Sequence, residues 1–464
     1  MQRSFRTCDI AGAGKELRKQ TNMGRWTALI DDMVAGRWIN PETGKPGTVP
    51  YESVVIAESL EGREAELVTS IGIKGRVAVV CDENTRDVMG IRIAKALQAA
   101  HNSGISGVEI VVLYHPHADE RHLAELKEKT RHVDALVAVG SGTINDLCKY
   151  VTAQDGRGYC VFGTAPSMNG YTSTTASITL ANGLKVSKPA HAPKGVFIDL
   201  AVNAAAPTYL IASGFGDCLV RSVAQFDWWL SHRMLNTFYT ELPFDLEIAD
   251  ERELMSRAPG LAKGDVAAVG YLHRVLTLCG FGVSFTGMSN HGSMGEHQIS
   301  HYIDCFAGDK HPGTLHGQQV GVASLTMARL QRQILDADGP PRVHPTKLDV
   351  PDMKRRYGEE VAAICLAEMA QKSLDEKGAE AFNAKLQELW PTLREELESF
   401  SVPVAVMHKA LKDSGGPTTA KELSLDVDFY REAVTHAREI RKRYSALDLA
   451  ADAGFLEEFA AGEG

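Results

Sequence analysis

The feature that most constrains the fold is an alternation of short apolar runs and helical patterns between residues 76 and 162. The runs are rich in β-branched residues, and polar residues or glycines follow each of them. Strands that are apolar on both faces and alternate with helices are typical of a parallel sheet covered on both sides. The expected strands are Arg76–Cys81, Val108–Leu113, Ala135–Val139 and Gly158–Phe162, with helices over Arg86–Ala100, Ala118–Thr130 and from Ile144.

The pattern changes after this alternation. Two runs flank Asn182-Gly183, a pair typical of a hairpin turn, and Gly195–Leu200 is a further expected strand. Beyond Val202 helical patterns continue to the end of the chain, with breaks at Gly-Pro-rich segments near 339 and 415. We therefore predict an α/β dinucleotide-binding domain over residues 1–205 and an all-helical metal- and substrate-binding domain over 206–464.

Charge and cysteine usage exclude several classes of function. The chain has 49 Lys and Arg against 59 Asp and Glu, a net charge of −10, and no basic cluster, which argues against a nucleic-acid partner. None of the eight cysteines forms a CxxC pair, and Met1–Leu17 lacks the apolar core of a signal peptide, so a reduced, cytoplasmic protein is expected. The most apolar stretch, Val266–Gly282, contains His273 and Arg274 and is shorter than the roughly 20 residues of a membrane span. It is predicted to be a buried core helix, with no membrane partner.

Three segments carry candidate cofactor-binding residues. Gly140-Ser141-Gly142-Thr143-Ile144 follows a buried strand and opens a helix, where backbone N–H groups favour an anion such as a pyrophosphate, although a plain tight turn fits too. Asp82 and Asn84 end the first strand, where an acid can hold a ribose hydroxyl or simply cap a helix. The third segment is the polar loop Thr164–Ser173, at the carboxyl end of the fourth strand.

The densest chemical signal is a group of histidines. Five of the sixteen histidines fall between residues 291 and 316, and His297 and His301 share one face of a helix because they are four residues apart. His316 lies where a Gly-containing loop enters the next helix. Imidazoles with one carboxylate suit Zn, Ni or Fe and leave a position open for substrate. The alternative is a set of surface or capping histidines. Asp217, in Gly214-Phe215-Gly216-Asp217, is a helix cap unless it faces these histidines.

In their order along the chain, GSGT, TAPSMNGYTS, GFGD, GEHQISH and LHG resemble the glycerol-1-phosphate dehydrogenase family, within the dehydroquinate synthase-like and iron-containing alcohol dehydrogenase group. The resemblance runs from about Arg76 to the segment 429–450. It implies an α/β domain that binds NAD or NADP, a helical domain, a site in the cleft between them, and a homodimer. It also implies a metal-dependent exchange between dihydroxyacetone phosphate and sn-glycerol 1-phosphate, with a small phosphorylated polyol or ketone as substrate.

The same resemblance assigns roles to individual residues. Asp217, His297 and His316 match the metal ligands, and His301 matches a position that contacts substrate. Catalytic roles are thus expected for Asp217, His301 and the loop residue Asn169. The cofactor would meet Asp82, Asn84, Gly140, Ser141, Gly142, Thr143, Ile144, Thr164, Ala165, Pro166, Ser167 and Ser173.

Two positions depart from the family pattern. Asn169 stands where the family usually has Asp, and an amide can hydrogen-bond but cannot act as a general base at neutral pH. Arg221 stands where iron-dependent relatives place a fourth ligand, His, which favours Zn or Ni over Fe. Arg221 could pair with a phosphate or take part in a structural ion pair.

These departures leave alternatives open. The same chemistry could act on another polyol or sugar phosphate, as Asn169 suggests. A dehydroquinate synthase-like lyase would oxidise and re-reduce NAD within one turnover. A non-catalytic homologue used for binding or assembly would not need the full set of metal ligands that this sequence carries.

Overall fold

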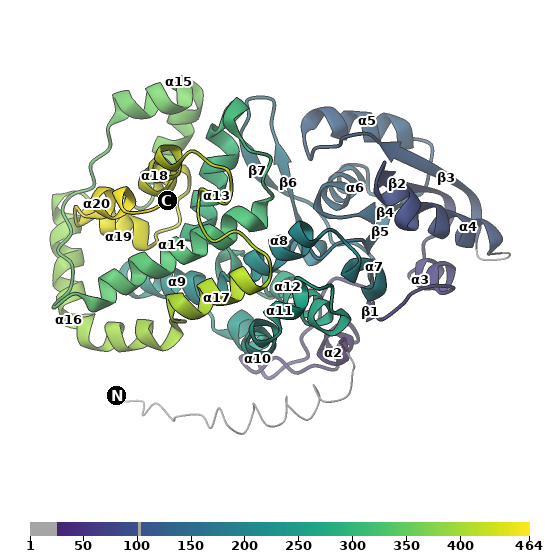
Figure 1. Cartoon of the computed structure of the whole chain (residues 1–464), viewed down its shortest axis with the longest axis horizontal. Helices are drawn as coiled ribbons and strands as arrows, with labels where there is room; N and C mark the ends of the chain where they lie inside the picture. Colours follow the sequence, from purple (N-terminus) through teal and green to yellow (C-terminus); the bar gives the residue numbers. More distant parts are fainter. Residues whose placement is uncertain (1–25, 101–103) are drawn as a thin grey trace.

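The computed structural model describes residues 26–100 and 104–464. The expectations for Met1–Leu17 and for Cys8 lie outside this described part. The chain forms two parts side by side (Figure 1). A parallel sheet with its covering helices makes one end of the molecule, and a helical assembly makes the other. This arrangement confirms the predicted fold class of an α/β part followed by a helical part.

Six strands form one wholly parallel sheet in the order β1-β8-β5-β4-β2-β3. Its central strand, β4, is buried along its whole length, as a strand apolar on both faces must be. The strands are β1 (Ser53–Ala57), β2 (Gly75–Asp82), β3 (Ile105–Leu113), β4 (Ala135–Gly140), β5 (Gly158–Gly163) and β8 (Gly195–Asp199).

Alternate residues of the central strands enter two different hydrophobic cores. Val137 packs in the smaller core with residues of α3 (Glu64–Ser70) and α4 (Ile91–Ala99). The neighbouring Ala138 packs in the larger core with residues of α5 (Glu120–Thr130) and α6 (Gly142–Asp155). Because side chains alternate across a strand, each face of the sheet acquires its own layer of helices. A π-helical turn, η1 (Arg86–Gly90), leads into α4.

The amino-terminal region contains a strand that the sequence analysis did not expect. β1 adds to the edge of the sheet by pairing with β8. Its five residues alternate in burial, and a loop connects it to the preceding helix α2 (Ala28–Val34). The predicted hairpin is present: β6 (Thr175–Thr179) and β7 (Lys185–Pro189) pair antiparallel around Asn182-Gly183.

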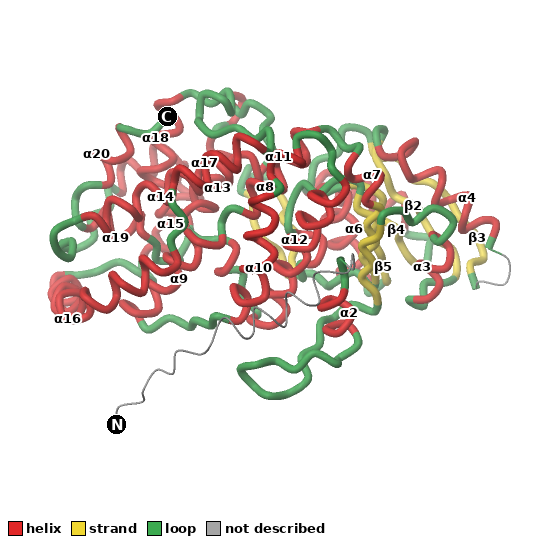
Figure 2. Tube along the Cα trace, turned by 60° about the horizontal axis from the view of Figure 1, so that its bottom comes forward, coloured by secondary structure: helices red, strands yellow, loops and turns green. Residues whose placement is uncertain are grey.

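Every described element after β8 is a helix, and Figure 2 shows these helices in red, joined by green loops. Short 3₁₀ turns lie between several of these helices: η3 (Asn290–Gly292), η4 (Gly308–Lys310) and η5 (Ala437–Ile440). A further 3₁₀ turn, η2 (Gly170–Thr172), lies between β5 and β6. The α-helices are α7 (Leu200–Ala204), α8 (Thr208–Cys218), α9 (Arg221–Leu235), α10 (Leu242–Ser256), α11 (Ala258–Leu261), α12 (Val266–Thr286), α13 (Gly295–Phe306), α14 (His316–Asp336), α15 (Val350–Met369), α16 (Glu376–Phe400), α17 (Val404–Asp413), α18 (Val427–His436), α19 (Ala446–Asp452) and α20 (Leu456–Ala461).

Helix α12 is the predicted core helix, but it is longer than the sequence suggested. It has 21 residues, so the argument from length against a membrane span was wrong. Burial takes the place of that argument, because 78% of its most apolar window is inside the protein.

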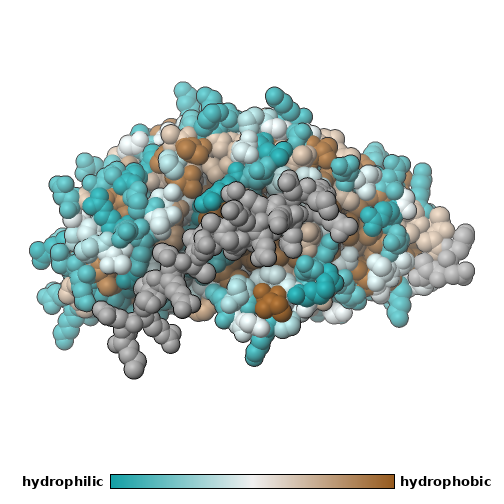
Figure 3. Space-filling model, turned by 90° about the horizontal axis from the view of Figure 1, so that it is seen from below, coloured by the Kyte–Doolittle hydropathy of each residue, from teal (hydrophilic) through white to brown (hydrophobic). Residues whose placement is uncertain are grey.

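The face seen in Figure 3 is mostly hydrophilic, with hydrophobic residues scattered among polar ones.

The order of the strands favours a ligand site at the carboxyl ends of the central strands. From β2 the chain moves outward to β3, whereas from β4 it moves in the opposite direction to β5. Ligands of open α/β sheets bind beyond the carboxyl ends of the strands at such a reversal. Two hydrogen bonds join the loops there: Thr85 Oγ1 donates to the carbonyl of Val139 at 2.9 Å, and Thr164 N donates to Gly140 O at 3.1 Å.

Candidate active site

Three predicted metal ligands come together from three helices. Asp217 lies in the last turn of α8, His297 in the first turn of α13, and His316 is the first residue of α14. Their ligand atoms all lie within 4.8 Å of one another. Asp217 Oδ1 is 3.6 Å from His297 Nε2, and the rings of His297 and His316 are 4.9 Å apart between centroids. We call these three residues the Asp-His-His trio.

Glycines bring two of these helices into backbone contact. A Cβ atom added at Gly216 would lie 2.1 Å from the carbonyl oxygen of Gly317, and one added at Gly317 would lie 2.0 Å from that of Ser213. No larger side chain fits at either position unless the helices separate. The close approach of α8 and α14 places Asp217 beside His316.

Hydrogen bonds fix which ring nitrogen each histidine presents to the trio. His297 Nδ1 lies 3.0 Å from Glu296 Oε1, and a carboxylate can only accept, so Nε2 is left with its lone pair. Ser300 Oγ donates to Gln319 Oε1 at 2.8 Å and accepts from His316 Nδ1 at 3.0 Å, which leaves His316 Nε2 free. Such outer partners are what metal-bound histidines require.

The charge state of the trio also suits a cation. Asp217 is 2% exposed, and its Oδ1 has no hydrogen-bond partner among the described residues. Burial raises the pKa of Asp217 and lowers the pKa of His316 well below its ordinary value. Two imidazoles and one carboxylate with an unpaired buried oxygen form a donor set that a divalent metal ion would satisfy.

His301 lies beside the trio, one turn after His297. Its ring centroid is 5.4 Å from that of His316 and 6.1 Å from that of His297. Burial lowers its pKa well below the ordinary value, and the nearby charge of Arg441 lowers it further. The imidazole is therefore neutral at pH 7 and is able to exchange hydrogen bonds with a substrate.

Asn169 connects the loop after β5 to the trio. Its backbone N–H donates to Asp217 Oδ2 at 2.9 Å, while its side-chain Nδ2 lies 3.7 Å from Cys279 Sγ. Cys279 belongs to a second buried group of potential ligand atoms, with Glu247 and His291. The sequence analysis left all cysteines without a role, because no spacing pattern links these residues.

The predicted cofactor segment at α6 lies along the carboxyl edge of the sheet. Ser141 is the N-cap of α6, but its side chain makes no capping hydrogen bond, and the first turn contains no acid. Ser141, Gly142 and Thr143 are partly exposed, so unpaired N–H groups of the helix start are open to a ligand. Ile144 turns inward and is 1% exposed.

The loop after β5 runs beside this helix start. Its first residues, which include Ala165 and Pro166, are buried, and Ser167 O accepts a hydrogen bond from Ser213 Oγ of α8 at 3.1 Å. Ser173, further along, is partly exposed and lies 2.9 Å from Thr175 between hydroxyl oxygens. The loop thus connects the predicted cofactor edge to the helix that carries Asp217.

Asp82 and Asn84 lie at the end of β2 on the same edge. Asp82 Oδ1 accepts hydrogen bonds from the N–H groups of Asn84 and Thr85, at 2.9 and 2.7 Å. These hydrogen bonds hold the turn before η1, whose N-cap is Thr85 and makes no side-chain capping hydrogen bond. A ribose contact of Asp82 or Asn84 stays a prediction.

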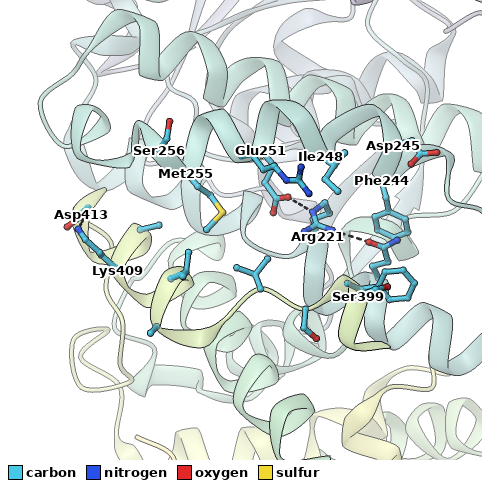
Figure 4. A pocket seen from close by; sticks show the side chains of 18 of the residues that line it. Arg221, Phe244, Asp245, Ile248, Glu251, Met255, Ser256, Ser399, Lys409 and Asp413 are labelled. Atoms are coloured by element: carbon cyan, nitrogen blue, oxygen red, sulfur yellow. Dashed lines mark hydrogen bonds and ion pairs between the residues drawn. The ribbon is translucent and has the colours of Figure 1, made fainter. Parts of the chain in front are cut away.

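Arg221 does not join the trio. Its guanidinium forms a buried ion pair with Glu251 and donates to Gln225 Oε1 at 3.0 Å. These contacts form part of the wall of a separate pocket of about 970 Å³ between α10 and α17 (Figure 4). Of the two roles that the sequence left open for Arg221, the structure shows the structural ion pair.

Comparison with known proteins finds one matching family model and several relatives of this chain. Residues 55–207 match the family model described as iron-containing alcohol dehydrogenase. A glycerol-1-phosphate dehydrogenase [NAD(P)+] of Bacillus velezensis is 28% identical over 380 residues, which cover 80% of this chain and 84% of the relative. The enzyme of the same name from Thermococcus kodakarensis is 29% identical over 60% of this chain and 77% of its own length. Over most of its length, the chain is thus similar to glycerol-1-phosphate dehydrogenases.

Solved structures agree on the fold. A glycerol dehydrogenase from Schizosaccharomyces pombe superposes with a TM-score of 0.56 at 18% identity, covering 89% of this chain and 90% of that one. A probable glycerol dehydrogenase from Sinorhizobium meliloti gives the same TM-score at 17% identity. At these identities, the two structures support the fold of this chain.

Proposed function

We propose that this chain interconverts dihydroxyacetone phosphate and sn-glycerol 1-phosphate. In the oxidising direction the secondary alcohol loses a hydride to NAD(P)⁺ and a proton to solvent, and the reverse direction uses NAD(P)H and a proton. The observation that carries this proposal is the Asp-His-His trio beside a neutral His301, joined to the cofactor edge of the sheet through Asn169. The names of the relatives supply the substrate.

The roles of the chain's own residues follow from their positions. Asp217, His297 and His316 would hold the divalent ion, which when bound supplies a Lewis acid that stabilises negative charge on the reacting oxygen. The open first turn of α6 would receive the cofactor pyrophosphate. His301 can relay the proton because its imidazole is neutral, whereas Asn169 can orient a hydroxyl but cannot remove its proton.

We also propose Zn or Ni rather than Fe as the metal. The support is the three-ligand donor set, in which Arg221 replaces a fourth histidine and is occupied by Glu251. A divalent ion with three protein ligands keeps a position open for substrate. Metal analysis of protein purified without added metal, followed by reconstitution of the apo-protein with each ion, tests this choice.

A direct assay tests the main proposal. Protein reconstituted with Zn or Ni should oxidise NADH or NADPH when dihydroxyacetone phosphate is added, and the product should be sn-glycerol 1-phosphate by a stereospecific assay. His316→Ala should abolish turnover. Full activity of His316→Ala would show that the trio does not hold the catalytic metal. Formation of the opposite enantiomer would overturn the substrate assignment.

Asn169 favours a second candidate, the same chemistry on another polyol or sugar phosphate. A panel of alcohols and ketones at fixed NADH concentration separates the two, because the true substrate should have the highest kcat/KM. A lyase that uses NAD transiently would form product without net consumption of NADH. Stoichiometric NADH loss therefore distinguishes the dehydrogenase from the lyase.

We propose that the protein acts as a homodimer in the cytoplasm. The support is the family resemblance and the cysteines, because all seven cysteines among the described residues are free thiols and six of them are buried. Light scattering of the purified chain tests the dimer, and fractionation of the source cells tests the location.

A further inference from the structure

The segment after α18 carries four cations within six residues, and the structure sorts them into three environments. Arg438 faces Asp448 and Asp452, at 3.6 Å from each. Lys442 is exposed. Arg441 and Arg443 are only partly exposed, and neither forms an ion pair with a carboxylate of the described part of the chain.

Of these two arginines, Arg441 contacts a residue of the candidate active site, and Arg443 contacts the loop before α13. Arg441 Nη2 lies 3.2 Å from His301 Nε2, which must accept because a guanidinium can only donate. Arg443 donates to the carbonyl of Ser293 and, at 2.8 Å, to Ser289 Oγ. Both guanidinium groups retain donors that no acceptor in the described part of the chain uses. His301 separates Arg441 from the trio by the width of one imidazole ring.

Two such cations close to each other are unfavourable without an anion. Burial lowers the pKa of Arg441, and burial together with the charge of Arg441 lowers the pKa of Arg443 to about 9. A partly desolvated guanidinium normally pairs with a carboxylate or a phosphate, often through two parallel hydrogen bonds. Two carboxylates lie near these arginines without forming an ion pair with either: Glu368 accepts from Lys442 N, and Glu296 accepts from His297 and Met294 through Oε1, while its Oε2 has no hydrogen-bond partner among the described residues.

We propose that Arg441 and Arg443 form the subsite that binds the phosphate group of the substrate. The inference rests on the proposed function, in which the reacting carbon must lie at the trio. One methylene and one ester oxygen separate that carbon from phosphorus in dihydroxyacetone phosphate, so the phosphate must bind immediately beside the trio. Arg441 occupies that position. Arg221, the other arginine considered for this role, is paired with Glu251 in a different pocket.

The subsite also links substrate recognition to His301. Because Arg441 donates to His301 Nε2, a phosphate held by Arg441 would fix the guanidinium that orients this imidazole. Substrates with a phosphate would therefore find His301 already positioned, whereas unphosphorylated triols would not supply the anion. The arginine pair thus determines specificity for phosphorylated over unphosphorylated substrates.

The experiment compares dihydroxyacetone phosphate with dihydroxyacetone, which has the same carbonyl and no phosphate. Arg441→Ala should lower the ratio of kcat/KM for the two substrates on the order of 30- to 100-fold, the effect expected when one charged hydrogen-bonding partner is lost. Arg441→Lys keeps the positive charge but loses the pair of parallel hydrogen bonds that a guanidinium can donate, so it should lower this ratio less. Lys442→Ala is the matched control, since it removes the neighbouring exposed charge and should leave the ratio unchanged.

Binding of inorganic phosphate supplies a readout that does not depend on turnover. Millimolar phosphate should raise the Tm of the metal-loaded wild type and of Lys442→Ala but not that of Arg441→Ala. If the wild type reduced an unphosphorylated ketone better than dihydroxyacetone phosphate, the proposed function would fail while this measurement still tested the subsite. An unchanged substrate ratio in Arg441→Ala, or equal phosphate binding by the wild type and this variant, would overturn the proposal.

Discussion

The backbone N–H of Asn169 donates to Asp217 Oδ2 at 2.9 Å, so a loop of the sheet directly holds one of the metal-ligand candidates of the helical part. The contact comes from the main chain and does not depend on the side chain at 169. The side chain instead contacts Cys279. The backbone of Asn169 thus orients the candidate metal ligand Asp217. Its side chain occupies the position where the glycerol-1-phosphate dehydrogenase family usually has an acid.

This division predicts that Asn169→Ala separates metal binding from turnover. The variant keeps the N–H donor to Asp217, so we expect metal content equal to that of the wild type by elemental analysis. Loss of the amide should lower kcat/KM by about 10-fold, the effect of one neutral hydrogen bond to substrate. Loss of the metal in this variant would show that the side chain, and not only the backbone, supports Asp217.

Glu296 should tune the affinity of the metal through His297. The carboxylate accepts from His297 Nδ1, so Glu296→Gln should lower the affinity for Zn by roughly 10- to 100-fold without removing a ligand. Competition with a chelator of known affinity measures the change. Glu432→Gln serves as the control, because Glu432 is exposed and accepts a hydrogen bond from Tyr302 rather than from a histidine of the trio. Equal affinities in the two variants would contradict the role of Glu296.

His273 should make the protein less stable as the pH falls. It is 1% exposed in α12 and lies 2.7 Å from Asn203 Oδ1, and burial lowers its pKa to about 3. Below its ordinary value of 6.5 the unfolded chain binds a proton that the folded chain does not. The free energy of unfolding therefore falls between about pH 6.5 and 3, by up to about 1.4 kcal/mol per pH unit from this group, and recovers as the pH rises.

Denaturant titrations of His273→Gln at pH 4.5, 5.5 and 6.5 test this origin. The variant keeps an N–H donor for Asn203 and should show a shallower pH dependence than the wild type, whatever its absolute stability. His344→Gln removes an exposed histidine and should retain the wild-type slope. If the slopes of wild type and His273→Gln are the same, another buried group causes the acid sensitivity.

Much of the fold could be predicted because local patterns were strong. Val137 and Ala138 lie in an apolar run that had to be buried on both faces, and Asn182-Gly183 required a hairpin. The strand β1 was missed because five residues that alternate in burial have no neighbouring pattern to mark them. Its place is set by pairing with β8, more than 130 residues away in the sequence, and no local signal shows such pairing.

The sequence could name the residues of the candidate site, but it could not predict the contacts that support them. The spacing of His297 and His301 is a local feature of one helix, whereas the contact of Arg441 with His301 joins segments 140 residues apart. Which cation finds a carboxylate is also decided by packing, since Arg221 pairs with Glu251 while Arg441 pairs with none in the described part of the chain. Sequence could name these charged residues but not assign their partners.

The glycine contact between α8 and α14 should be essential for the trio. Gly216→Ala would place a Cβ atom 2.1 Å from the carbonyl oxygen of Gly317. Neither atom can turn aside, because the Cβ is fixed to the backbone of α8 and the oxygen belongs to the backbone of α14. The helices must separate, which moves Asp217 away from His316. We expect a loss of about 1–3 kcal/mol in the free energy of unfolding from this overpacking and a fall in metal affinity of at least about 10-fold.

The matched control is Gly339→Ala, because nothing lies within 4 Å of the Cβ that this change would add. Its stability and its metal affinity should both equal those of the wild type. Differential scanning calorimetry with and without Zn separates the two effects of Gly216→Ala, since lost affinity reduces the rise in Tm on adding metal, whereas lost packing lowers the Tm of the apo-protein. If Gly216→Ala lowered the apo Tm but kept the full rise on adding Zn, the helix contact would stabilise the fold without positioning the ligands.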